Sequence, residues 1–278
     1  MKTLLALFGF ASLACGAPDG SPALSTSGGA PPSPETGGAP PSSATGGSAS
    51  HSGGASAEGG APIDEPNPLG RYRCKAPQGT SAAPQTIQEA VALINALPKP
   101  TTVACFVESL ARPLTINATN SMFSAQPAGS TASPRVFIKF GQLWLSVVID
   151  GDATNLIEFG YLLPNTFRSI KAEVQLPLET RLADSDPFDR LMFSDLGTIC
   201  RLCHTEEQRE EMAGIDNVFS SKALKPRPET RVSVESLALE AKNCDWQTEP
   251  HRCEMLAAVF GGGAVVAGAF PEEMQTFF

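Results

Sequence analysis

Histidine and basic residues are scarce in this chain. It has 3 histidines in 278 residues, and its 20 Lys plus Arg are outnumbered by 29 Asp plus Glu, a net charge of −9. A negative charge argues against nucleic-acid binding, which needs a basic surface for the phosphate backbone. Only His204 and His251 lie outside the Gly/Ser-rich segment 16–68, and no nucleophile–base pair or full metal triad is evident. We therefore do not expect an enzyme.

The apolar run at the N-terminus, residues 4–14, is too short to span a bilayer as a helix. Lys2 precedes it, and it ends in Ser12-Leu13-Ala14-Cys15. This pattern resembles a bacterial lipoprotein signal, although Ser12 stands where such signals usually have Leu, Val or Ile. We expect residues 1–15 to direct export and Cys15 to carry a lipid anchor. The protein would then lie in the cell envelope, as an outer-membrane lipoprotein or in the periplasm; ordinary secretion is the alternative.

Residues 16–68 contain no Phe, Trp or Tyr, and 44 of these 53 residues are Gly, Ser, Ala, Pro or Thr. Such a segment buries too little apolar surface to offset the entropy that ordering it would cost. The sequence therefore predicts a disordered linker that holds a folded part away from a membrane.

The strongest motif is Cys200-Arg201-Leu202-Cys203-His204, followed by Thr205. The spacing C-x-x-C-H is the one by which proteins attach haem covalently. CxxCHT resembles the attachment site of c-type cytochromes. The resemblance implies one haem c, thioether bonds from Cys200 and Cys203, and His204 as the proximal iron ligand. Such attachment takes place outside the cytoplasm, in agreement with the expected export.

The resemblance also implies a distal iron ligand downstream of the motif. Met274, late in the chain and near a proline, is the first candidate, although only four residues follow it where the family has a long helix. His251 is the alternative and would give a bis-histidine haem of lower reduction potential. Met255, one turn after His251, is a third candidate, and an open distal position is a fourth.

Other uses of a C-x-x-C pair stay open at this point. A thioredoxin-like redox pair would need an alternation of strand and helix around it, which the sequence lacks. A structural zinc site would combine Cys200 and Cys203 with Cys244 and with Cys253 or His251. A plain disulfide between Cys200 and Cys203 is the remaining alternative.

Apart from Cys15, Cys200 and Cys203, four cysteines remain, which suffice for two disulfides in an oxidising compartment. We prefer Cys74 with Cys105 and Cys244 with Cys253, because each bridge then stays within one predicted domain. Four cysteines allow three connectivities, and the sequence alone does not choose among them.

The hydrophobic pattern predicts an α+β protein in two parts. Residues 86–97 read as a helix, with Thr86 and Glu89 as a capping box. Strands are then predicted at 102–108, 136–140, 143–149, 156–162 and 169–176, which indicates a small antiparallel β-sandwich over residues 69–183. Helices are predicted at 188–199, 205–212, 234–242 and 250–260, so residues 184–278 are expected to form a mostly helical, cytochrome c-like domain.

Two functions of different classes follow from these observations. The first is an envelope lipoprotein that carries one covalent haem and acts in electron transfer or redox sensing, with a redox protein as its partner. The alternative is a haem-free surface protein, held together by disulfides or zinc, with a binding or structural role.

Overall fold

The computed structural model describes residues 64–66 and 72–277, and all of them belong to one compact unit. The predicted signal peptide with Cys15, and the predicted linker up to residue 63, lie outside the described residues. Strand β1 (Asp64–Pro66) pairs with β2 (Tyr72–Arg73) in a small sheet of its own. Every helix in the described part is too short or too polar to cross a lipid bilayer.

One large sheet organises the rest of the described chain. Its strands follow the spatial order β10-β11-β7-β6-β5-β4-β3-β12, with β13 paired to β3. Only β13 runs parallel to its neighbour. The strands are β3 (Leu114–Thr119), β4 (Arg135–Phe140), β5 (Leu143–Val148), β6 (Leu156–Leu162), β7 (Arg168–Gln175), β10 (Gln208–Arg209), β11 (Phe219–Lys222), β12 (Arg231–Val232) and β13 (Val265–Ala267).

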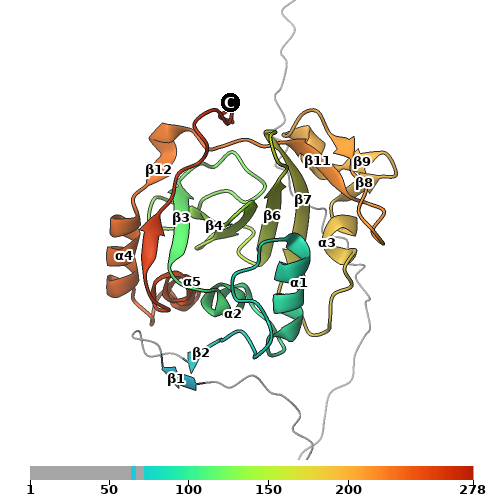
Figure 1. The fold of residues 1–278 in the computed structure, drawn as a ribbon. Helices are drawn as coiled ribbons and strands as arrows, with labels where there is room; N and C mark the ends of the chain where they lie inside the picture. Colours follow the sequence, from blue (N-terminus) through green and yellow to red (C-terminus); the bar gives the residue numbers. More distant parts are fainter. Residues whose placement is uncertain (1–63, 67–71, 278) are drawn as a thin grey trace, which may run out of the picture. The chain divides into compact units, whose positions relative to one another are not determined.

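The helices are short and accompany this sheet. Figure 1 shows α1, α2 and α5 together along the lower side of the view, with α4 beside β13 and α3 beside β7. Their bounds are α1 (Ile87–Ala96), α2 (Val103–Ser109), α3 (Asp186–Asp189), α4 (Val234–Asn243) and α5 (Pro250–Phe260). Two 3₁₀ helices, η1 (Ile199–Leu202) and η2 (Pro228–Thr230), and a two-stranded hairpin of β8 (Met192–Ser194) and β9 (Gly197–Thr198) complete the fold.

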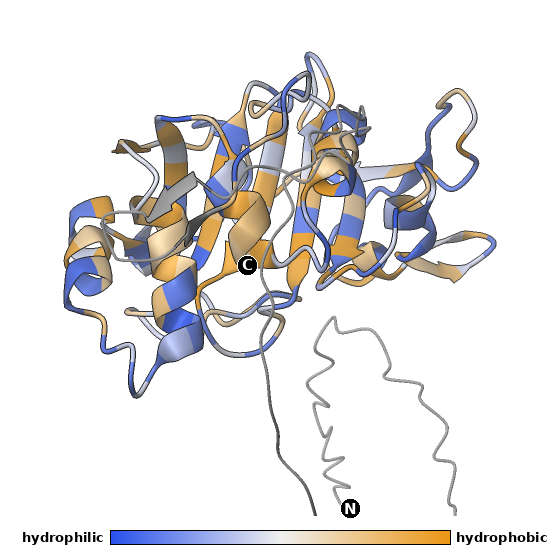
Figure 2. Cartoon of the chain, turned by 90° about the horizontal axis from the view of Figure 1, so that it is seen from below, coloured by the Kyte–Doolittle hydropathy of each residue, from blue (hydrophilic) through white to orange (hydrophobic). Residues whose placement is uncertain are grey.

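The two faces of the sheet differ in character. Along the central strands, apolar and polar side chains alternate, as the colours of Figure 2 show. One row of paired residues is at most 2% exposed and packs with the buried residues of the helices: Ile116, Ile138, Leu145, Phe159 and Ala172. The opposite face, here called the polar face, carries Arg135, Ser146, Glu158, Lys171 and Glu173.

The predicted fold class is wrong. The described chain contains one nine-stranded sheet rather than a β-sandwich, and no helical cytochrome c-like half follows it. Strands β10 to β13 come from the part of the chain after residue 184 and join β7 and β3, which come from the part before it. The sheet therefore runs across the position where the sequence predicted a boundary between domains 69–183 and 184–278.

Two of the predicted helices do not form. Residues 188–199 contain the end of α3 and the β8–β9 hairpin, and residues 205–212 contain only β10. The second segment is rich in helix formers, but its glutamates bind other parts of the chain. Glu207 accepts hydrogen bonds from Thr198, Glu210 accepts one from Ser220, and Glu206 pairs with Lys222. These tertiary contacts outweigh the weak intrinsic helix propensity of the segment.

The predicted strand 102–108 is in fact helix α2. Thr102 begins this helix, because its hydroxyl accepts a hydrogen bond from the backbone N–H of Cys105 at 3.1 Å. Residues 103–107 are all buried, so the segment shows no periodicity that separates a short helix from a buried strand.

The remaining predicted elements are confirmed. The backbone N–H of Glu89 donates to the Thr86 hydroxyl at the start of α1, and Ser233 caps α4 in the same way. The β4–β5 hairpin turns at Gly141, whose φ of 56° lies in the left-handed region that glycine tolerates best. Helix α5 ends at Gly261, as predicted.

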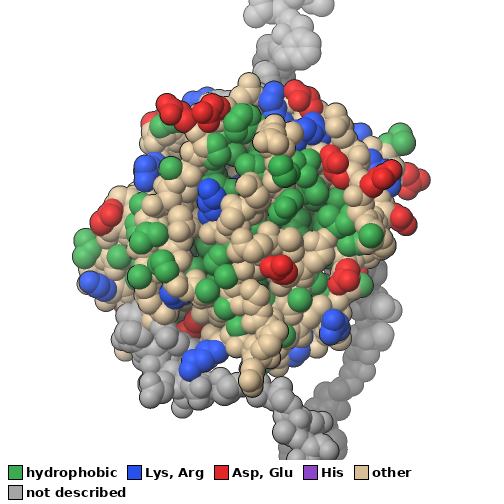
Figure 3. Space-filling view, in the orientation of Figure 1, with side chains coloured by type: hydrophobic (Ala, Val, Ile, Leu, Met, Phe, Trp, Pro, Cys, Tyr) green, Lys and Arg blue, Asp and Glu red, His purple; other side chains and the backbone are tan. Residues whose placement is uncertain are grey.

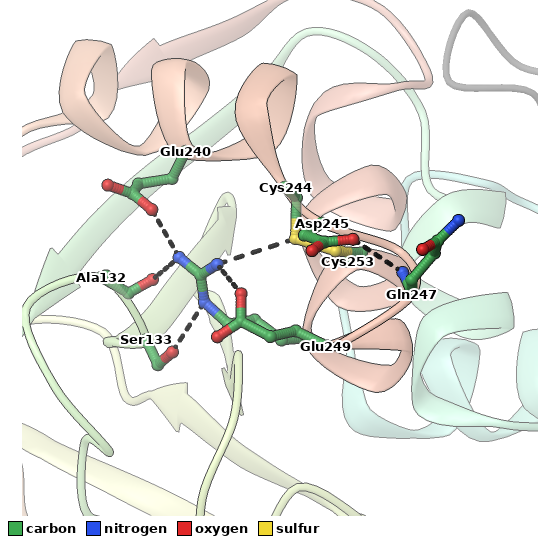
Figure 4. Close-up of a disulfide and its surroundings, with 9 residues drawn as sticks. Ala132, Ser133, Glu240, Cys244, Asp245, Gln247, Glu249 and Cys253 are labelled. Carbon is green, nitrogen blue, oxygen red and sulfur yellow. Dashed lines mark hydrogen bonds and ion pairs between the residues drawn. A yellow bond between two sulfur atoms is a disulfide. The ribbon is translucent and has the colours of Figure 1, made fainter.

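Both predicted disulfides are confirmed. Cys74 bonds to Cys105, and Cys244 at the end of α4 bonds to Cys253 in α5. Figure 4 shows the surroundings of the second bridge, and Arg252, which is 6% exposed, lies next to it with a guanidinium nitrogen 3.6 Å from the Cys244 sulfur. It donates hydrogen bonds to Glu240 at 2.6 Å, Glu249 at 3.0 Å, and the loop residues Ala132 and Ser133. The disulfide and this arginine together tie α4, α5 and the loop before β4.

The outer surface is mixed in charge. On the face seen in Figure 3, acidic and basic side chains are interspersed among hydrophobic ones rather than gathered by sign.

Candidate functional site

The C-x-x-C-H motif forms a single 3₁₀ turn that leaves strand β9. The Thr198 hydroxyl accepts a hydrogen bond from the backbone N–H of Cys200 at 3.2 Å, which fixes the start of η1. Glu207 accepts hydrogen bonds from both the N–H and the hydroxyl of Thr198. The carbonyl of Cys200 accepts from the N–H groups of Cys203 and His204, at 3.1 and 2.8 Å. One short turn therefore presents both thiols and the imidazole.

Cys200 and Cys203 keep their thiols, although the other four cysteines of the described residues form disulfides. Burial raises the pKa of the Cys200 thiol to about 11, and the nearby Lys171 opposes this shift. Reactive redox cysteines have a lowered thiol pKa, because the thiolate is the attacking form. The environment of Cys200 is the reverse of the one that a thioredoxin-like pair requires.

His204 is held by its Nδ1 atom. This nitrogen lies 2.8 Å from the carbonyl oxygen of Lys222 in β11, so Nδ1 carries the proton and donates it to that oxygen. Burial, with a contribution from Lys171, lowers the pKa of His204 to about 3, so the ring is neutral at pH 7. Metal-bound histidines are oriented by such a hydrogen bond from the second ring nitrogen. Within the described chain, Nε2 has no hydrogen-bond partner.

The motif lies near the polar face of the sheet. Lys171 interacts electrostatically with both Cys200 and His204, and Arg135 with His204. Arg135 forms an ion pair with Glu158 at 2.5 Å, and Arg190 forms one with Glu173 at 2.6 Å. Burial, with Glu158, raises the pKa of Glu173, whereas the bond from Arg190 lowers it.

Exposed apolar side chains flank the motif on the outside. Phe193 and Leu196 of the β8–β9 hairpin are 68% and 84% exposed, and Leu202, between the two cysteines, is 57% exposed. The Phe193 ring lies 5.9 Å from the guanidinium carbon of Arg201, so this side chain is next to the turn that carries the motif.

The candidate distal ligands lie in different parts of the molecule. His251 is exposed at the start of α5, and Met255 is 2% exposed within the hydrophobic core. Met274 is 5% exposed and belongs to the C-terminal segment. That segment runs beside Lys225, which donates its N–H to Gln275 and lies three residues after the partner of His204. Of the three candidates, Met274 is the one whose segment borders the chain that holds His204.

The predicted zinc site is not assembled. Cys244 and Cys253 are joined to each other, so they are not available as partners for Cys200 and Cys203. In the described ranges, no group of three or more His, Cys, Asp or Glu side chains is placed to hold a metal ion.

Sequence reasoning missed the residues that surround the motif. The alternation of β7 indicated that Lys171 points away from the core, but not that it lies near Cys200 and His204. The sequence predicts that Glu207 belongs to a charged helix, whereas in the fold it accepts the hydrogen bonds that fix Thr198. The relation of Lys171 and Glu207 to the motif becomes visible only in the folded chain.

Comparison with known proteins identifies no relative. A scan against protein-family models finds no match, and neither a search of curated proteins nor one of solved structures finds a similar protein.

Proposed function

We propose that this protein binds one haem c covalently and acts in electron transfer or redox sensing. The observation that carries the proposal is the state of the motif: two thiols outside any disulfide, next to a neutral imidazole held by Nδ1. Cys200 and Cys203 would form the thioethers, and Nε2 of His204 would bind the iron. When bound, the haem would supply the one-electron chemistry.

The protein's residues would position and shield this group. The hydrogen bond to the Lys222 carbonyl fixes the ring plane of His204 and makes Nε2 a better ligand. The exposed side chains of Phe193, Leu196 and Leu202 offer apolar surface that a porphyrin can cover. Burial of such surface contributes roughly 25 cal/mol per Å².

The proposal includes the cellular setting. Export through residues 1–15 would bring the chain to the compartment where haem is attached, and a lipid on Cys15 would hold it at the outer membrane or leave it facing the periplasm. Its partner would be another redox protein of the envelope.

Intact mass and absorption spectra test the proposal directly. The full chain is produced in cells that carry a haem c attachment pathway. We expect the mass of one porphyrin added, and a red colour that survives extraction with acid and acetone. The Cys200→Ser/Cys203→Ser double variant should lose both. An unmodified mass, or a mass two hydrogens lighter from a Cys200–Cys203 disulfide, would support the haem-free, disulfide-stapled alternative instead.

Met274 is the proposed distal ligand, because its segment lies beside the chain that holds His204. Replacing Met274 by Ala should change the haem absorption bands and lower the reduction potential, since a methionine ligand favours the reduced iron. His251→Gln is the control, and it should leave both unchanged because His251 is exposed on α5. The opposite pattern would make His251 the ligand.

A further inference from the structure

The loop of residues 120–134, which joins β3 to β4, exposes two neighbouring apolar side chains. Met122 is 74% exposed and Phe123 is 81% exposed. Other positions of the same loop are buried, among them Gln126 at 0% and Ala128 at 3%. The loop is therefore packed at its base and leaves its two largest apolar side chains in water, where their hydration is unfavourable.

Hydrogen bonds hold the tip of this loop in place. Gln126 exchanges hydrogen bonds with β5 and β6, at 2.5 and 2.9 Å, and so fixes the base. The backbone N–H of Phe123 donates to the Ser121 hydroxyl at 3.4 Å. The backbone N–H of Ser124 donates to the Met122 carbonyl at 3.1 Å. An ordered turn thus presents Met122 and Phe123 to the outside.

The chain around the tip carries no charge. Residues 113–134 contain no Asp, Glu, Lys, Arg or His, although 18% of the whole chain is charged. Charged side chains are the most costly ones to bring into a lipid bilayer. The backbone N–H groups of Phe123 and Ser124 are already bonded, which lowers their cost of leaving water. The tip can therefore enter an apolar surface without taking a charge with it.

Charges of both signs lie beside the loop. Arg231 is exposed and pairs in register with Thr119, the last residue before the loop. Asp150 and Asp152 are exposed near its other end, where a Cβ added to Gly129 would lie 2.6 Å from the Asp150 carbonyl oxygen. The aspartates oppose any attraction of Arg231 to an anionic surface. The apolar side chains are therefore the groups that decide what the loop binds.

We propose that Met122 and Phe123 insert into the headgroup region of a lipid bilayer, so that the folded unit rests on a membrane through this loop. An aromatic ring and a thioether chain on an uncharged turn suit the boundary between headgroups and acyl chains. The proposed lipid on Cys15 would keep the loop close to that surface. A Gly/Ser-rich linker of 53 residues, as the sequence predicts for 16–68, has an r.m.s. span of roughly 40 Å. Such confinement makes a weak contact effective.

Vesicle flotation tests this contact without the lipid anchor. The chain of residues 16–278, which contains every element described above and lacks Cys15, is mixed with vesicles of phosphatidylethanolamine and phosphatidylglycerol. We expect the parent chain to float with the vesicles, also in about 0.5 M NaCl, because salt does not screen an apolar contact. Phe123→Ser should lower the ratio of bound to free protein about tenfold, the factor expected for one large apolar side chain. Met122→Ser/Phe123→Ser should lower it further.

Leu239→Ser is the matched control, because it removes a 59% exposed apolar side chain from α4, and it should float like the parent. Equal flotation of the parent and both loop variants would overturn the inference, and so would a parent that does not float. Light scattering without vesicles adds a further check. A parent that is dimeric while Phe123→Ser is monomeric would assign the loop to a contact between two copies, against this inference.

The same flotation on haem-loaded chain separates this contact from the proposed haem site. Loaded and unloaded chain should float equally. Flotation that disappears on loading would mean that the haem covers the tip, and the inference would be wrong. A chain that never carries haem but floats through Phe123 would reject the proposed function and leave the membrane contact standing.

Discussion

At the scale of single residues, the fold keeps one thiol and the imidazole of the motif uncharged. Burial holds the Cys200 thiol protonated and the His204 ring neutral. Burial also disfavours the charged form of Lys171 and lowers its pKa to about 8. Reversible thiol exchange requires a thiolate, so the protonated Cys200 thiol is poorly suited to it.

The lowered pKa of Lys171 predicts how stability depends on pH. Between pH 8 and 10.5 the unfolded chain binds more protons at this lysine than the folded chain does. The free energy of unfolding should therefore rise with pH across this window. In haem-free protein, Lys171→Met should be more stable than the parent by about 1–3 kcal/mol at pH 7, and its stability should rise less between pH 8 and 10.5.

Urea unfolding at several pH values measures this effect, with Lys139→Met as the control because it removes a lysine from the same face. A Lys171→Met chain less stable than the parent at pH 7 would mean that the ammonium group has a partner in the haem-free protein.

What the sequence reveals at this scale depends on local spacing. The roles proposed for Cys200, Cys203 and His204 follow from five consecutive residues. Lys171 and Lys222, whose carbonyl binds His204, lie 29 and 22 positions away from Cys200 along the chain, on opposite sides of it, and only the pairing of β7 with β11 brings their strands together.

At the scale of elements, α4 and α5 are joined by the Cys244–Cys253 bridge and by Arg252. The bridge spans 9 residues, so it restricts the unfolded chain only modestly. Arg252 adds ion pairs to Glu240 and Glu249, whose side chains are 42% and 48% exposed and can return to water if the arginine is lost.

Removing this bridge should weaken the fold and leave the haem in place. The Cys244→Ser/Cys253→Ser double variant should lose about 2–3 kcal/mol of unfolding free energy, the value expected for a short loop. Its haem content by mass should equal that of the parent, because neither cysteine belongs to the proposed attachment site. Loss of haem in this variant would contradict that assignment.

The elements that sequence reasoning found are those with a local signal. Helix α1 has its cap at Thr86 and a clear apolar face, and β7 alternates over its whole length. The segment 205–212 has the composition of a helix, but its conformation depends on contacts of Glu207 and Glu210 with Thr198 and Ser220. Propensity alone carries no information about such contacts.

At the scale of the whole molecule, the sheet interleaves the two parts of the chain. Strand β3 pairs with β12 and β13, and β7 pairs with β11, across 50 to 150 residues of sequence. The sequence predicted two domains because the hydrophobic period changes near residue 184. The hydrophobic period of a segment does not depend on which distant strand it pairs with. The sequence pattern therefore could not predict that the two parts share one sheet.

This interleaving predicts one cooperative unfolding transition. Circular dichroism, tryptophan fluorescence and haem absorbance should give the same midpoint, as for a single two-state unit. A fragment of residues 69–183 should not fold alone, because it lacks β11, β12 and β13. Two separated transitions, or a soluble folded fragment, would show that the parts are independent.

The strands at the two edges of the sheet, β10 on one side and β12 with β13 on the other, have only two or three residues each. Such short edges offer an incoming chain almost no free backbone to extend the sheet. Many copies of this protein can therefore be crowded together without joining edge to edge into fibres.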